Sequence, residues 1–216
     1  MSPAELMQAI LRARVELMYF GGIGTYIKAS QQSHEQVGDK GNDAIRINAS
    51  ELRCHVLGEG ANLAMTQLAR IEFAQRGGKL NTDFVDNSAG VDTSDHEVNI
   101  KILLQPMIQS KKLIEQEREK LLVSMTGDVG SHVLKNNYDQ SLALSLLERR
   151  AAEELPIQAQ LMRQLEREGL LDRRIEDLPD DDSLQRLLQR RVGLTRPELA
   201  VVLAYSKMDL FNKLLA

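Results

Sequence analysis

Hydrophobic positions are spaced differently in the two halves of the chain. In residues 1–100 they form short runs that end in turns, and this part holds ten of the 14 glycines but only eight leucines. Residues 101–216 hold 25 leucines, together with 18 basic and 18 acidic residues. The first pattern predicts strands that end in functional turns, and the second predicts amphipathic helices with polar outer faces.

Three short apolar runs in the first part are candidate strands, and each precedes a turn of small residues. The run–turn pairs are Val15–Phe20 with Gly21–Thr25, Arg53–Leu57 with Gly58–Asn62, and Phe84–Val85 with Asn87–Gly90. A helix is expected from Thr66 to Gln75 and should stop at Gly77-Gly78. Strand, turn, helix and strand in this order predict a βαβ unit. The expected fold is therefore α/β, a partial Rossmann-like parallel sheet followed by a mostly α-helical region.

Capping boxes, in which glutamate follows a serine or threonine by three residues, predict three helix starts. These begin at Ser2, Ser94 and Thr195, and the helix from Ser94 should end or kink at Pro106. The helix that follows Thr195 is still running at Ala216 without a stop signal. A truncated chain is therefore expected.

Composition excludes several classes of protein. The formal net charge of −4 and only eight aromatic residues argue against a dedicated nucleic-acid binder. A single cysteine, Cys54, excludes an internal disulfide and a cysteine-based zinc cluster within one chain. The longest apolar stretches, such as Leu199–Tyr205, are far shorter than the roughly 18 residues of a membrane span. The N-terminus lacks the pattern of a secretory signal, so a cytoplasmic location is expected.

The three small-residue turns are the places where a ligand could bind. In an open parallel sheet, ligands bind at the carboxyl ends of the strands, where glycine allows close approach and asparagine can both donate and accept. Neither GxGxxG nor GxxxxGK[ST] occurs in the chain. Each turn alone could simply be a tight connection between buried strands, but three such turns together favour a ligand crevice.

No metal site is expected. Asp95, His96 and Glu97 are successive residues of a predicted helix and would point in different directions. The other histidines lack partners at ligand spacing, and Cys54 lies in an apolar run where an inert buried thiol is usual.

Longer motifs around the turns carry a resemblance to a known family. The segments 21–28, 58–63 and 87–101 closely resemble the large bacterial NAD-specific glutamate dehydrogenases. The similarity continues through Met125-Thr126, Asn137-Tyr138 and residues 170–173 to residues 193–200, so it covers nearly the whole chain. The resemblance implies a partial NAD-binding α/β domain over residues 1–108. Residues 109–216 would then be the truncated start of a helical C-terminal region.

The resemblance also implies roles for individual residues. Gly22 and Gly24 would flank the middle of the cofactor, while Gly60 and Asn62 belong to a Glu-Gly-Ala-Asn turn whose asparagine lies against the nicotinamide. Asn87 would hydrogen-bond the nicotinamide carboxamide.

Two further residues would contact the substrate. Val91 would pack by its carbon chain, and Ser94 would bind the side-chain carboxylate of glutamate, besides being a candidate N-cap. The catalytic lysine and aspartate of the family lie upstream in the substrate domain, which implies that Lys28, Lys101 and the rest of this chain hold no catalytic residue.

The expected function is oxidative deamination of L-glutamate to 2-oxoglutarate and ammonia with NAD, by a homo-oligomeric enzyme that includes the rest of the parent chain. The isolated chain should be inactive. One alternative is another NAD-dependent amino-acid dehydrogenase, for leucine, valine or phenylalanine. A second alternative, of a different class, is a non-catalytic interaction module formed by the helices of residues 101–216.

Overall fold

The computed structural model describes residues 1–215, and it divides the chain into two compact units. One unit combines residues 1–86 with those from 143 onward, and we call it the sheet unit. The other comprises residues 87–142, and we call it the helical unit. No helix within the described residues is long and apolar enough to cross a membrane.

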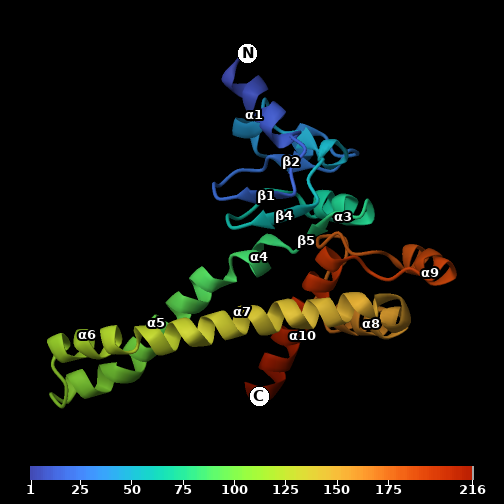
Figure 1. Cartoon of the computed structure of the whole chain (residues 1–216). Coiled ribbons are helices and arrows are strands. Elements are labelled where there is room, and N and C mark those ends of the chain that lie inside the picture. The colour runs from blue at the N-terminus through green and yellow to red at the C-terminus, as the bar shows by residue number, and fades with distance from the viewer. Residues whose placement is uncertain (216) are drawn as a thin grey trace. The chain divides into compact units, whose positions relative to one another are not determined.

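Three parallel strands form the main sheet of the sheet unit, in the order β1-β4-β5 (Figure 1). The strands are β1 (Leu17–Phe20), β4 (Val56–Glu59) and β5 (Lys79–Leu80). Phe20 is paired with Glu59, so β1 and β4 end side by side at the same edge of the sheet. A second, two-stranded parallel sheet joins β2 (Ile27–Lys28) to β3 (Ile47–Asn48). These strands confirm the α/β class.

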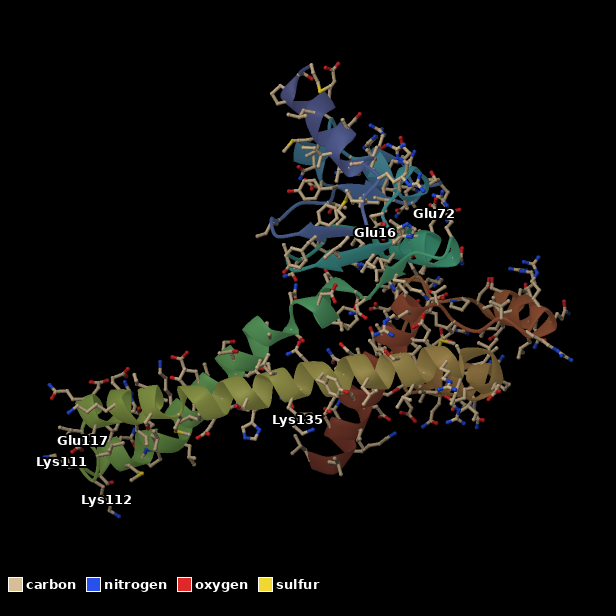
Figure 2. The ribbon with its side chains drawn as sticks, in the orientation of Figure 1. Glu16, Glu72, Lys111, Lys112, Glu117 and Lys135 are labelled. Carbon is tan, nitrogen blue, oxygen red and sulfur yellow. The ribbon has the colours of Figure 1, made fainter. Side chains whose placement is uncertain are left out.

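Helix α3 (Gln67–Gln75) is the crossover between β4 and β5. Its N-cap is Thr66, whose side chain accepts a hydrogen bond from Ala69 N–H, and its C-cap is Arg76, as the sequence predicts within one residue. Phe73 packs in the core beneath the sheet with Ile27 and Leu57. On its outer side, Glu72 (Figure 2) accepts hydrogen bonds from the backbone N–H and Oγ of Ser30, at 2.7 and 2.6 Å. The helix is therefore fixed to both sheets.

The remaining regular elements of the sheet unit are helices. It contains α1 (Pro3–Leu11), α2 (His34–Val37), η1 (Lys40–Asn42), η2 (Ala49–Glu51), α4 (Asp83–Asp86), the end of α7 (Thr126–Arg149), α8 (Ala151–Arg167), α9 (Asp181–Arg190) and α10 (Arg196–Leu215). The capping box at Ser2 is confirmed, and Glu198 accepts a hydrogen bond from Thr195 N–H at the start of α10. A second core lies among these helices, with Leu155, Met162 and Leu165 fully buried.

The helical unit has a much smaller interior. It consists of α5 (Ser88–Gln109), α6 (Glu115–Ser124) and the first part of α7. Among its described residues only Leu104 and Val133 are buried. Lys111 and Lys112 follow the end of α5, where cations interact favourably with the helix dipole (Figure 2).

The prediction of a strand at Phe84–Val85 is wrong. These residues belong to the short helix α4, because Val85 and Asp86 donate their backbone N–H groups to Thr82 O at 3.1 Å. The third strand lies just upstream, where Lys79 N–H donates to His55 O.

The prediction that a helix begins at Ser94 is also wrong. Helix α5 begins at Ser88 with Asn87 at its N-cap, so Asn87–Gly90 is the start of a helix rather than a turn after a strand. Glu97 forms an ion pair with Lys101 at 2.6 Å. Pro106 lies inside α5, which continues three residues beyond it. The expected boundary between the NAD-binding domain and the helical C-terminal region, at residue 108, falls near the end of this helix. It stays a prediction.

Candidate functional site

The turn after β1 is held in a conformation that requires glycine. Gly24 has a φ of 141°, and a Cβ atom there would lie only 2.7 Å from Asn42 Nδ2 and 2.9 Å from the Tyr26 ring. Gly22 is exposed and its surroundings are open, with the nearest atom, Tyr26 Oη, 3.9 Å from an ideal Cβ. The backbone of this turn is therefore accessible at Gly22 and tightly packed at Gly24.

A network of polar groups from residues 39–46 supports this turn. Asp39 accepts hydrogen bonds from Thr25 N–H at 2.9 Å and from Asn42 Nδ2 at 2.6 Å, and these two bonds lower the pKa of Asp39. The fully buried guanidinium of Arg46 donates to Thr25 O at 2.8 Å. This role of Asp39 and Arg46 was not predicted from the sequence, because no local pattern indicates that their partner is the glycine turn.

The turn after β4 lies beside the first one. Ala61 N–H donates to Phe20 O at 3.0 Å, which joins the start of this turn to the end of β1. A side chain at Gly60 would overlap Tyr19 of β1, and Asn62 is exposed. The predicted proximity of Gly22 and Gly24 to Gly60 and Asn62, at the carboxyl edge of a parallel sheet, agrees with the register of β1 and β4.

A buried cluster of charges lies beneath the second turn. Arg70 of α3 binds both carboxylate oxygens of Glu59 at 2.7 Å and lies 3.2 Å from Asp83 Oδ1. The side chains of Arg70 and Glu59 are only 6% and 1% exposed. Burial raises the pKa of Glu59. Burial alone would lower the pKa of Arg70, but its hydrogen bonds and the charges of Glu59 and Asp83 raise it, so the guanidinium stays charged.

The sheet unit also has two cavities, one beside the turn after β4 and one distant from both turns. A cavity of about 440 Å³ borders β1 and β4, and its lining includes Tyr19, Gly58 and Asp86. Another, of about 550 Å³, lies between α3 and α9 and is lined by no residue of either turn. The first cavity is therefore the one that adjoins the candidate site.

The other predicted site residues lie in the helical unit, at the start of α5. Asn87 is half-buried, and Ser88 Oγ donates to Asn137 Oδ1 of α7 at 2.7 Å. Val91 is 63% exposed, and Ser94 is exposed with its Oγ donating to Val91 O at 2.8 Å. Spacings of four and three residues bring Asn87, Val91 and Ser94 to one side of the helix.

The histidines and Cys54 form neither a metal site nor a reactive nucleophile within residues 1–215. Within residues 1–215 no group of three or more histidine, cysteine, aspartate and glutamate side chains is arranged to hold a metal ion. His96 lies 3.5 Å from Asp92, and its ring stacks at a tilt 6.2 Å from that of His132. Burial raises the pKa of the Cys54 thiol, which makes it a weak nucleophile.

The chain is an α/β protein with two adjacent turns at the carboxyl edge of a parallel sheet, the edge at which such folds commonly bind small ligands. Comparison with known proteins gives the family. The model of the bacterial NAD-glutamate dehydrogenase catalytic domain matches residues 1–147, and the chain belongs to this family.

Relatives named NAD-specific glutamate dehydrogenase are similar over the whole chain. The protein from Pseudomonas aeruginosa is 53% identical over 215 residues, and those from Mycobacterium tuberculosis and Halomonas elongata are 46% and 45% identical over 216 residues. All of this chain is covered in each comparison, but it spans only 13% of the length of each relative.

Proposed function

We propose that this chain is part of an NAD-dependent glutamate dehydrogenase, which converts L-glutamate to 2-oxoglutarate and ammonia together with the rest of its parent chain. The observation that carries this proposal is the pair of adjacent turns after β1 and β4, in a chain that matches the catalytic domain of that family over residues 1–147. The relatives named NAD-specific glutamate dehydrogenase support NAD as the cofactor.

The residues of the two turns fit a dinucleotide. Gly22 presents accessible backbone, and the exposed Asn62 has an amide that can both donate to and accept from a nicotinamide carboxamide. Asn87 is proposed as the second asparagine at the carboxamide, while Gly24 and Gly60 keep the turn backbones close to the sheet. When bound, NAD supplies the nicotinamide that accepts a hydride. The protein groups bind and orient it.

Val91 and Ser94 are proposed to bind glutamate. Because α5 begins at Ser88, Ser94 lies well inside the helix, and the positive end of the helix dipole is at Ser88. The contact with the substrate carboxylate must therefore come from the Ser94 hydroxyl itself. To donate to the carboxylate, Oγ would have to leave its hydrogen bond to Val91 O.

The first experiment measures NADH formation from glutamate and NAD. We expect the 216-residue chain to give no turnover above a no-enzyme control, because the family's catalytic lysine and aspartate lie elsewhere. The full-length parent enzyme should be active. Turnover by the short chain alone would contradict the proposed division of roles, and inactivity of the parent with glutamate would contradict the function. The proposed homo-oligomeric, cytoplasmic parent is tested separately by sedimentation and cell fractionation.

The Ser94→Ala variant of the parent tests the substrate. We expect the KM for glutamate to rise about tenfold or more, because a hydrogen bond to a charged group is lost. Ser124→Ala is a matched control, since Ser124 is also exposed and donates to a carbonyl three residues earlier. An unchanged glutamate KM in Ser94→Ala would favour a dehydrogenase for an apolar amino acid.

A further inference from the structure

Two buried acidic side chains, Glu59 and Asp83, hold the turn that carries Asn62. Glu59, at its beginning, is buried, and its carboxylate accepts two hydrogen bonds from Arg70 of α3. Asp83 of α4 accepts from Leu63 N–H through Oδ2 at 2.8 Å. Leu63 has a φ of 64°, which is unfavourable for a residue other than glycine. Both ends of the turn, on either side of Asn62, are thus held by carboxylates.

Arg70 connects these two carboxylates. It binds Glu59 through two nitrogen atoms at 2.7 Å, and its Nη2 lies 3.2 Å from Asp83 Oδ1. Only a planar guanidinium can bind one carboxylate with two parallel hydrogen bonds and still reach a second. The Asp83 carboxylate faces Arg70 with one oxygen and the turn with the other. One side chain of α3 therefore determines the positions of both ends of the turn.

Burial strengthens the ion pairs that Arg70 forms with Glu59 and Asp83. Two carboxylates and one guanidinium lie in a site where their side chains are at most 10% exposed. Without Arg70, the carboxylates of Glu59 and Asp83 would lose the cation that contacts them both, and they would repel each other or take up protons. The turn could then keep its present conformation only at a large cost.

We infer that Arg70 is a positioning residue for the nicotinamide side of the site, which acts through Glu59 and Asp83 on the turn that presents Asn62. This inference rests on the proposed function, because Asn62 matters only if the cofactor lies there. Arg70 is itself buried and would not touch the cofactor. Its effect should appear in the binding of NAD and not in the binding of glutamate.

The kinetic test uses the full-length parent enzyme with Arg70→Lys and Arg70→Met. We expect the KM for NAD to rise about tenfold or more in Arg70→Met, and less in Arg70→Lys, because misplaced binding groups cost at least this much. The KM for glutamate should change less than about twofold, a split that general loss of structure would not produce. Arg76→Met is the matched control, since Arg76 caps the same helix, is exposed and donates to Ala49 O.

A triple variant separates positioning from stability. Glu59→Gln, Arg70→Met and Asp83→Asn together remove every charge of the cluster, so no unpaired charge stays buried. We expect its melting temperature to recover most of what Arg70→Met loses, while its KM for NAD remains raised about tenfold. A KM for NAD that returns to the wild-type value together with the melting temperature would overturn the inference.

A direct measurement on the 216-residue chain does not depend on activity. In Arg70→Lys, amide hydrogen exchange at Leu63 should become about tenfold faster, while exchange at Leu57 in β4 should be unchanged. Unchanged exchange at Leu63 would overturn the inference even if the parent enzyme proves to be a glutamate dehydrogenase. If exchange changes as expected but the wild-type parent does not oxidise glutamate with NAD, the proposed function fails and the role of Arg70 in the turn remains.

Discussion

The sheet unit and the helical unit are stabilised by different kinds of interaction. In the sheet unit two apolar cores are accompanied by buried charged groups with bonds across the sequence, such as Arg46 to Thr25 O and Arg70 to Glu59. In the helical unit only two described side chains are buried, and pairs such as Glu97–Lys101 and Lys135–Asp139 are exposed and four residues apart. Tertiary packing therefore determines the first unit, whereas helix propensity and local pairs contribute more to the second.

The largest difference is expected from truncating a leucine in each unit. Leu155→Ala should lower the free energy of unfolding by about 2–5 kcal/mol, because Leu155 is completely buried and its removal leaves a cavity. Leu103→Ala should change it by less than about 0.5 kcal/mol, because Leu103 is 75% exposed. Urea unfolding of the 216-residue chain measures both. Equal losses would mean that the helical unit has a core of comparable importance.

Two glycine substitutions should have opposite signs. A Cβ atom at Gly193 would overlap the backbone of Ala151 in α8, so Gly193→Ala should destabilise the chain by about 1–3 kcal/mol. Gly130 lies inside α7 with open space around it, so Gly130→Ala should stabilise the chain by about 0.5–1 kcal/mol. Urea unfolding of the 216-residue chain measures both changes in stability. A gain of stability in Gly193→Ala would show that the close approach of residues 151 and 193 is not needed.

The parts of the fold that were predictable are those determined by local sequence. The strand before Gly21, the helix expected from Thr66 to Gln75 and the capping box at Ser2 depend on neighbouring residues, and all three are confirmed. The pattern at Ser94 and Glu97 is equally good as a capping box, but α5 has already begun at Ser88. A local pattern cannot show that a helix started earlier.

The support of the candidate site could not be predicted in the same way. Arg70 pairs with Glu59 across 11 residues and approaches Asp83, which directly precedes the segment expected as a strand. Only the folded arrangement of α3, β4 and α4 brings these three side chains together. The adjacency of the two glycine turns was predictable, because it follows from the parallel pairing of β1 and β4. The roles of individual residues at those turns remain proposals.

A smaller effect, which depends on pH, is expected from the buried charge at Glu198. Burial raises the pKa of Glu198 above its ordinary value of 4.5, although hydrogen bonds from Thr195 act in the opposite direction. A raised pKa in the folded state gives stability that is present below the unfolded-state pKa and is lost as the pH rises through the folded-state pKa. Between about pH 5 and about pH 7, the wild type should therefore lose more stability than Glu198→Gln.

Urea unfolding at the two pH values measures this difference. Glu153→Gln, at an exposed position of α8, is the control and should follow the wild type. If Glu198→Gln and the wild type change in parallel, the carboxyl group does not titrate differently in the folded and unfolded states.

The smallest effect is expected at an exposed ion pair of the helical unit. Lys135 (Figure 2) lies 2.6 Å from Asp139, and their side chains are 70% and 52% exposed. In water such a pair gains little, because solvent screens the charges and two long side chains lose freedom. Lys135→Ala should therefore change the free energy of unfolding by less than about 0.5 kcal/mol, and added salt should reduce even that. A loss above about 1 kcal/mol would mean that surface charge, and not only helix propensity, determines the stability of this unit.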